Sequence, residues 1–106
     1  METDLSVKYY YIVNSDLNMS KGKCAAQVSH VAMQLAQHNN KLGKAIILKS
    51  EGSLLRAMCN TNPRLVYKIE DAGLTEVPKG SLTCVGVVEC KATKHMIPYL
   101  KTLKLL

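Results

Sequence analysis

The chain has 106 residues, which is enough for one domain with a modest hydrophobic core and too few for a separate catalytic domain. Its formal net charge of +6 favours an anionic partner such as nucleic acid, although a generic basic surface has the same charge. No stretch approaches the ~20 apolar residues of a membrane span, and residues 1–5 lack the apolar segment of a secretory signal. The composition therefore predicts a cytoplasmic protein without a membrane partner.

The four cysteines lie at positions 24, 59, 84 and 90. They form neither a Cys-x-x-Cys pair nor a Cys/His cluster with the spacing of a zinc site. Cys24 and Cys84 fall in apolar segments, where free cysteine usually behaves as a small hydrophobic residue. We therefore expect reduced thiols, no metal site and no cofactor.

The first predicted elements are a strand, a helix and a second strand. Residues 9–13 form a continuous apolar and aromatic run, which is typical of an inner strand covered on both faces. Residues 24–36 carry apolar side chains at helical spacing along one face. Residues 45–48 indicate a second buried strand. A strand, a helix and a strand in this order predict a parallel pair of strands.

The next segment predicts a short helix followed by two strands. Ser50 and Ser53 are both plausible N-caps for the helix, and the polar cluster at residues 60–63 ends it. Residues 65–69 and 82–88 indicate a third and a fourth strand, separated by a turn-rich loop.

The last predicted element is a helix capped by Thr93, in which Pro98 either introduces a kink or marks a later start. The order is then β-α-β-α-β-β-α, which predicts a single-domain α/β/α sandwich with a mixed four-stranded β-sheet and helices on both faces. Ligands of open α/β sheets gather at the carboxyl ends of strands. We therefore expect the polar loops at residues 16–23 and 71–81 to share one edge of the sheet.

Two lysines stand at the start of the first predicted helix. Lys21 and Lys23 flank Gly22, and no acidic residue accompanies them, although the positive end of a helix normally attracts acidic side chains. Gly22 allows another backbone or a ligand to come close. This arrangement predicts a site for a phosphate or for a developing oxyanion.

One face of the same helix is polar, with the side chains of Lys23, Gln27, His30 and Gln34 on one line. A solvated helix face explains such a stripe about equally well. The lysines at the helix start favour a binding site over a merely solvated face.

Two longer segments carry recognisable patterns. Residues 16–30 read DLNMSKGKCAAQVSH, and residues 71–86 read DAGLTEVPKGSLTCVG. They resemble the D-x-K-M-x-K-G-K-x-A-A-Q-x-x-H and D-A-G-R-T-x-x-x-x-G-x-x-T-x-x-G elements of the peptidyl-tRNA hydrolases of the archaeal and eukaryotic type (type 2). The resemblance runs from about Lys8 to the C-terminus and is weak between residues 39 and 62. It implies hydrolysis of the ester between a peptide and the terminal ribose of tRNA, with tRNA as partner and a homodimer as the assembly.

The resemblance also implies a set of catalytic residues, each of which has a simpler alternative role. Lys23 would stabilise the oxyanion or only bind phosphate, and Asp71 would pair with Lys23, act as base, or only form an Asx turn. Thr75 and Thr83 would orient water or the ester, although threonine is also a common strand residue. Gln27 would point its amide at the same place or remain solvated.

Four further residues are predicted to surround the substrate. Lys21 would bind phosphate, and Gly22 and Asp16 belong to the same matching segment. His30 is a neighbour of the site that can serve as base near neutral pH, or is packed or caps the helix. Whether Asp71 or His30 activates water is left open by the sequence.

The chain departs from the family pattern at three places. Leu74 stands where arginine is usual, Asn18 where lysine is common, and residues 87–89 replace the usual I-G-P. These departures motivate an alternative, a catalytically weak tRNA- or partner-binding protein on the same fold. A second alternative is an unrelated phosphate-binding α/β protein, which the lack of a P-loop or G-x-G-x-x-G pattern disfavours.

Overall fold

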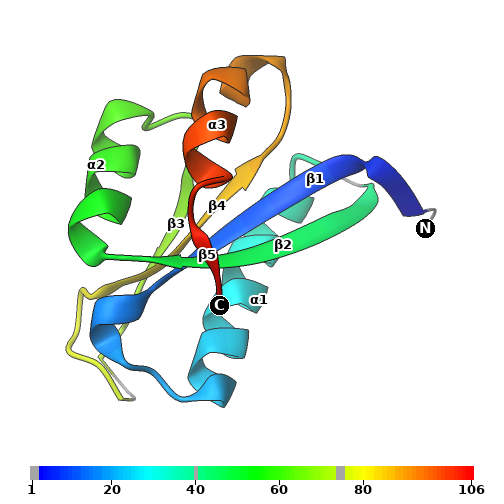
Figure 1. Ribbon diagram of the computed structural model, residues 1–106. Helices are drawn as coiled ribbons and strands as arrows, with labels where there is room; N and C mark the ends of the chain where they lie inside the picture. The colour runs from blue at the N-terminus through cyan, green and yellow to red at the C-terminus, as the bar shows by residue number, and fades with distance from the viewer. Residues whose placement is uncertain (1–2, 40, 74–75) are drawn as a thin grey trace.

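The fold is a mixed α/β arrangement in which helices cover both faces of one β-sheet (Figure 1). The computed structural model describes residues 3–39, 41–73 and 76–106. Within these residues the sheet has five strands in the order β3-β4-β1-β2-β5. The long strand β1 therefore lies at the centre, with two strands on either side.

The pairing of the strands makes the sheet mixed. β1 pairs in parallel with β2 and antiparallel with β4, and β3 pairs antiparallel with β4. β5 pairs antiparallel with β2 at the other edge. The parallel β1–β2 pair predicted from the sequence is confirmed. The strands are β1 (Thr3–Asn14), β2 (Leu42–Ser50), β3 (Tyr67–Glu70), β4 (Leu82–Val88) and β5 (Lys104–Leu105).

The helices form two layers around the sheet. Helix α1 lies on one face, and α2 and α3 lie on the other (Figure 1). Short 3-10 helices follow β1 and precede α3. The bounds are η1 (Ser15–Leu17), α1 (Lys21–Ala36), α2 (Gly52–Thr61), η2 (Lys91–Met96) and α3 (Ile97–Leu100).

Two hydrophobic clusters fill the spaces between these layers, and β1 contributes to both. Tyr9 and Tyr11 pack with α1, whereas Tyr10 and Ile12 pack with α2 and α3. Successive side chains of a strand point to opposite faces, so an apolar run is required where both faces are covered. The prediction of an inner strand at residues 9–13 is therefore confirmed.

The predicted four-stranded sheet is wrong by one strand. β5 is only two residues long and both are exposed, so it carries no apolar alternation that could indicate a strand. It is defined only by its pairing with Leu48 and Lys49 of β2. The third strand also begins at Tyr67 rather than at residue 65, so the predicted bounds were too wide at that end.

The start of α2 differs from the prediction as well. Neither Ser50 nor Ser53 caps it, because Glu51 occupies the N-cap position and makes no side-chain capping bond. Instead the carboxylate of Asp16 accepts a hydrogen bond from the Gly52 backbone N–H at 2.9 Å. The cap comes from a residue 36 positions away along the chain, which no local pattern can indicate.

The C-terminal helical segment begins as η2. Cys90 rather than Thr93 is its N-cap, and Thr93 is the third residue, whose hydroxyl accepts a hydrogen bond from the Cys90 backbone N–H at 2.9 Å. Pro98 lies in the first turn of α3, which confirms the prediction that it marks a later start.

Gly86, in the middle of β4, sets how closely α1 approaches the sheet. A Cβ atom added there would overlap Val31 Cγ1 of α1 and lie 3.2 Å from Leu35 Cδ1. Because Gly86 has no side chain, α1 can pack directly against β4. This close packing brings the first turns of α1 over the start of β4 and the loop that precedes it.

Candidate functional site

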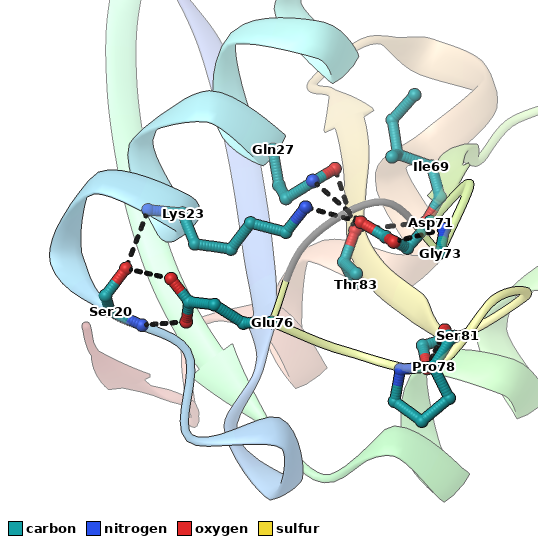
Figure 2. Close-up of polar contacts among 10 residues, drawn as sticks. All are labelled: Ser20, Lys23, Gln27, Ile69, Asp71, Gly73, Glu76, Pro78, Ser81 and Thr83. Carbon is teal, nitrogen blue, oxygen red and sulfur yellow. Dashed lines mark hydrogen bonds and ion pairs between the residues drawn. The ribbon is translucent and has the colours of Figure 1, made fainter.

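The candidate site lies where the first turns of α1 meet the loop between β3 and β4 (Figure 2). The backbone N–H of Asp71 donates to Ser81 O at 2.9 Å, and Gly80 N–H donates to Asp71 O at 2.7 Å. These two bonds close the base of the loop, so that Asp71 is fixed directly after β3. The predicted meeting of the two polar loops at one edge is confirmed by hydrogen bonds between Ser20 and Glu76.

An ion pair between Lys23 and Asp71 is the centre of the site. Lys23 Nζ donates to Asp71 Oδ2, and the two side chains are only 9% and 4% exposed. The other carboxylate oxygen, Oδ1, accepts a hydrogen bond from Gly73 N–H at 2.7 Å. Asp71 therefore combines two of its predicted roles, since it forms an Asx-type turn and also holds Lys23.

Gln27 extends the ion pair into the sheet. Its Nε2 lies 3.5 Å from Asp71 Oδ2, and its Oε1 accepts a hydrogen bond from Thr83 Oγ1 at 3.0 Å (Figure 2). Gln27 and Thr83 are both buried, so the alternative of a solvated Gln27 is wrong. The Thr83 hydroxyl also lies 3.2 Å from Ile69 O, and its single proton is shared between the two acceptors. The four polar side chains thus form one connected network.

A pocket of about 300 Å³ opens beside this network. Lys23, Gln27 and Asp71 line it together with the exposed side chain of His30. Ile69, Glu70 and Ala72 complete its wall. A ligand in the pocket would meet a nearly buried ammonium and a nearly buried carboxylate, a combination that can stabilise an oxyanion and take a proton from water.

The other predicted residues that the structure describes lie outside the pocket lining. Lys21 and Gly22 are exposed in the first turn of α1, and a Cβ atom added at Gly22 would meet nothing within 4 Å. Asp16 faces the start of α2, as its bond to Gly52 shows. Thr75 falls outside the described residues, so its predicted role stays a prediction.

A carboxylate of the protein itself, that of Glu76, lies at the start of α1. Ser20 is the N-cap, and its Oγ accepts a hydrogen bond from Lys23 N–H at 3.2 Å. The Ser20 backbone N–H and hydroxyl both donate to the carboxylate of Glu76. These bonds, and to a lesser degree the charge of Lys23, hold the pKa of Glu76 below its ordinary value.

Sequence reasoning missed both Ser20 and Glu76. A serine immediately before an apolar helical run is a recognised N-cap signal, so Ser20 could have been found. Glu76 could not, because it is 56 residues from Ser20 and no local spacing links them.

The cysteines offer no reactive thiolate near the pocket. All four are free thiols. Burial, together with the charge of Glu76, raises the pKa of Cys24, the residue after Lys23. Burial raises the pKa of Cys84 in β4 to about 12. Both thiols therefore stay protonated near neutral pH and are poor nucleophiles.

Two features are absent from the residues that the structure describes. No group of three or more His, Cys, Asp or Glu side chains in this part of the chain is arranged to hold a metal ion. None of the helices described is both long and apolar enough to cross a membrane.

Those departures from the family pattern that fall within the described residues lie away from the pocket. Asn18 has a φ of 46°, a left-handed conformation that asparagine adopts more readily than most residues. Val87 is buried in the core, and Glu89 lies 4.0 Å from Lys8 in an ion pair. Leu74 is outside the described residues.

The amino-acid sequence matches the family described as Peptidyl-tRNA hydrolase PTH2 over residues 7–106. A peptidyl-tRNA hydrolase of Methanococcus maripaludis is 37% identical over 111 residues, covering 90% of this chain and 95% of the relative. One of Staphylothermus marinus is 38% identical, with 76% and 79% covered. One of Saccharolobus islandicus is 34% identical, with 76% and 84% covered. The matched residues include the entire Lys23–Asp71 network, and this chain belongs to the family of peptidyl-tRNA hydrolases.

Proposed function

We propose that this protein hydrolyses the ester bond of peptidyl-tRNA and releases free tRNA and peptide. The observation that carries the proposal is the nearly buried Lys23–Asp71 ion pair at the wall of an open pocket, continued through Gln27 to Thr83. Membership of the family supports the same reaction.

The reaction needs an attacking water, a stabilised oxyanion and a protonated leaving group. The water oxygen adds to the ester carbonyl carbon and gives its proton to a base of the pocket. The ammonium of Lys23 stabilises the negative charge that develops on the carbonyl oxygen. When the bond between the carbonyl carbon and the ribose oxygen breaks, the ribose oxygen takes up the proton held by that base. The released acid loses its remaining proton to solvent, so the peptide leaves as its carboxylate.

Two groups of the pocket are candidates for the base, Asp71 and His30. Asp71 contacts Lys23 directly and is held in place by Gly73, whereas the His30 side chain is exposed. We propose Asp71 as the base and Gln27 with Thr83 as the residues that orient it. A variant His30→Gln should then retain the reaction, whereas Asp71→Asn should lose it.

The tRNA body is proposed to bind through phosphate contacts near the start of α1. Lys21 and Gly22 are exposed there, and the chain has a net charge of +6. Each phosphate that is neutralised should contribute a slope of roughly −0.7 to −0.9 to the log–log dependence of affinity on salt. An affinity that does not change with salt would contradict this proposal.

The decisive experiment is single-turnover release of the peptide from an N-blocked aminoacyl-tRNA. The wild-type protein should release it, and Lys23→Ala and Asp71→Ala should each lower the rate by about 10²–10³. No release by the wild type, with salt-sensitive tRNA binding retained, would instead support the alternative of a tRNA-binding protein on the same fold.

We further propose that residues 1–106 act as one domain that forms a homodimer. An apolar hollow of about 350 Å³ lies beside Tyr9 and Tyr11, and exposed Met33 and Leu42 line it. Exposed apolar surface of this kind is typical of an interface. Light scattering on the purified protein should give twice the mass of one chain, and Met33→Glu should shift it to the monomer.

A cytoplasmic location is part of the same proposal. It is supported by four free thiols, which suit a reducing compartment, and by the location of translation. Microscopy of the tagged full chain tests it.

A further inference from the structure

Glu76 joins the loop between β3 and β4 to the start of α1 by two hydrogen bonds. Its Oε1 accepts from the Ser20 backbone N–H at 2.9 Å, and its Oε2 accepts from the Ser20 hydroxyl (Figure 2). The side chain lies outside the pocket lining, so the carboxylate does not face the space that a substrate would enter.

Ser20 transmits this contact to Lys23. The Ser20 oxygen that donates to Glu76 also accepts a hydrogen bond from the backbone N–H of Lys23 at 3.2 Å. The side chain of the same lysine reaches Asp71 at the other end of the loop. The loop therefore contacts the first turn of α1 through two carboxylates, one on the backbone side of Lys23 and one at its ammonium.

The charges favour the same geometry. The first turn of α1 has no acidic residue of its own, and the positive end of a helix is stabilised by a nearby carboxylate. Glu76 provides this carboxylate, and Lys23 attracts it as well. If Glu76 were neutral or absent, the loop would lose its attraction to the helix end, and Asp71 would hold Lys23 without a second anchor.

We propose that Glu76 is a positioning residue for hydrolysis at this site. It fixes the first turn of α1 against the loop, so that the Lys23 ammonium meets Asp71 at the pocket wall. Glu76 itself contacts neither the attacking water nor the ester. This inference rests on the proposed function, because positioning is defined by the reaction that Lys23 and Asp71 carry out.

A purely structural role and a positioning role predict different results. Loss of a structural bond lowers stability but leaves the rate of the folded protein unchanged. Loss of a positioning bond lowers the rate at which bound substrate is hydrolysed. The protein concentration that gives half of the maximal rate stays the same. Displacements of about 1 Å in a catalytic group can lower a rate by roughly 10²-fold.

The test compares Glu76→Ala, Glu76→Gln and a charge-matched control, Glu89→Gln. Glu89 pairs with Lys8 at the opposite end of β4, so the control adds the same net charge without touching the site. The single-turnover rate at saturation should fall about 10-fold or more in Glu76→Ala. It should fall by a smaller factor in Glu76→Gln, because glutamine keeps one acceptor for Ser20. It should not change in Glu89→Gln. An unchanged rate in Glu76→Ala, or a change only in half-saturation, would overturn the proposal.

A second measurement does not depend on activity. The ammonium group of Lys23, held by Asp71, should give a resolved signal in the ¹⁵N spectrum of the lysine side chains, and Lys23→Arg identifies it. The proposal predicts that this signal broadens or disappears in Glu76→Ala and Ser20→Ala and persists in Ser20→Thr. A persistent signal in Glu76→Ala refutes the positioning role even if the wild-type protein releases no peptide. An inactive wild type alone refutes only the proposed function.

Discussion

The Lys23–Asp71 ion pair makes the sharpest prediction, because its contributions to stability and to catalysis can be separated. We consider Lys23→Met, Asp71→Asn and the double variant. Both side chains are nearly buried, at 9% and 4% exposed, so each single substitution removes the opposite charge from beside a group with little exposure to solvent. The double substitution removes both charges and approximately preserves the volume.

The two single variants should differ in stability. Breaking a buried ion pair from one side typically costs about 3–5 kcal/mol of unfolding free energy. Lys23→Met should cost about 3 kcal/mol, near the lower limit, because Gly73 N–H still donates to the remaining carboxylate. Asp71→Asn should cost only about 1 kcal/mol, since the long lysine side chain can turn its ammonium into water.

The double variant should recover most of this loss, to within about 1 kcal/mol of the wild type, because no unpaired charge remains. It should nevertheless stay about 10²–10³ below the wild-type rate of peptide release, since the groups that stabilise the oxyanion and take the proton are both absent. Urea denaturation monitored by circular dichroism gives the coupling energy of the cycle, and single-turnover release gives the rates.

Two results would refute this reasoning. If the losses of stability in the single variants simply add in the double variant, Lys23 and Asp71 do not stabilise the fold as a pair. If the double variant regains activity together with stability, the single variants were slow because they were partly unfolded, and neither residue takes part in the chemistry.

Three further predictions concern packing, hydrogen bonding and pH. Gly86→Ala should lower the unfolding free energy by about 1–3 kcal/mol, because the new methyl group overlaps Val31, and unchanged urea denaturation would contradict the close packing of α1 on β4. Thr83→Val should lower the unfolding free energy by about 1–3 kcal/mol, because it leaves the buried oxygen of Gln27 without its donor. Thr83→Ser keeps the hydroxyl and should keep most of the stability. The pKa of Glu76 lies below its ordinary value of 4.5, so its charged form stabilises the fold above that pH. The wild type should therefore have a higher melting temperature than Glu76→Gln at neutral pH, and this difference should vanish as the pH falls through the lowered pKa. A difference in melting temperature that remains in acid would contradict the prediction.

The sequence by itself determined the elements whose neighbours along the chain define them. The apolar run at residues 9–13 and the helical spacing at residues 24–36 correctly indicated β1 and α1. Their order with β2 determined the parallel pair, because a helical connection between adjacent strands returns the chain in the same direction. Lys23 and Gln27 were placed on one helix line for the same reason, since helical periodicity fixes which side chains share a face.

Only the tertiary structure decided which groups from distant segments meet. Asp71 is 48 residues from Lys23, and the sequence left their pairing as only one of three alternatives, which the structure resolves. Glu76 is 56 residues from Ser20, and no local spacing connects them. The short strand β5 is defined by its partner alone. Periodicity indicates whether a side chain faces the core or the solvent, but it does not indicate which residues of other elements that side chain contacts. That depends on how closely the layers pack, which in this protein is set by Gly86 beneath α1.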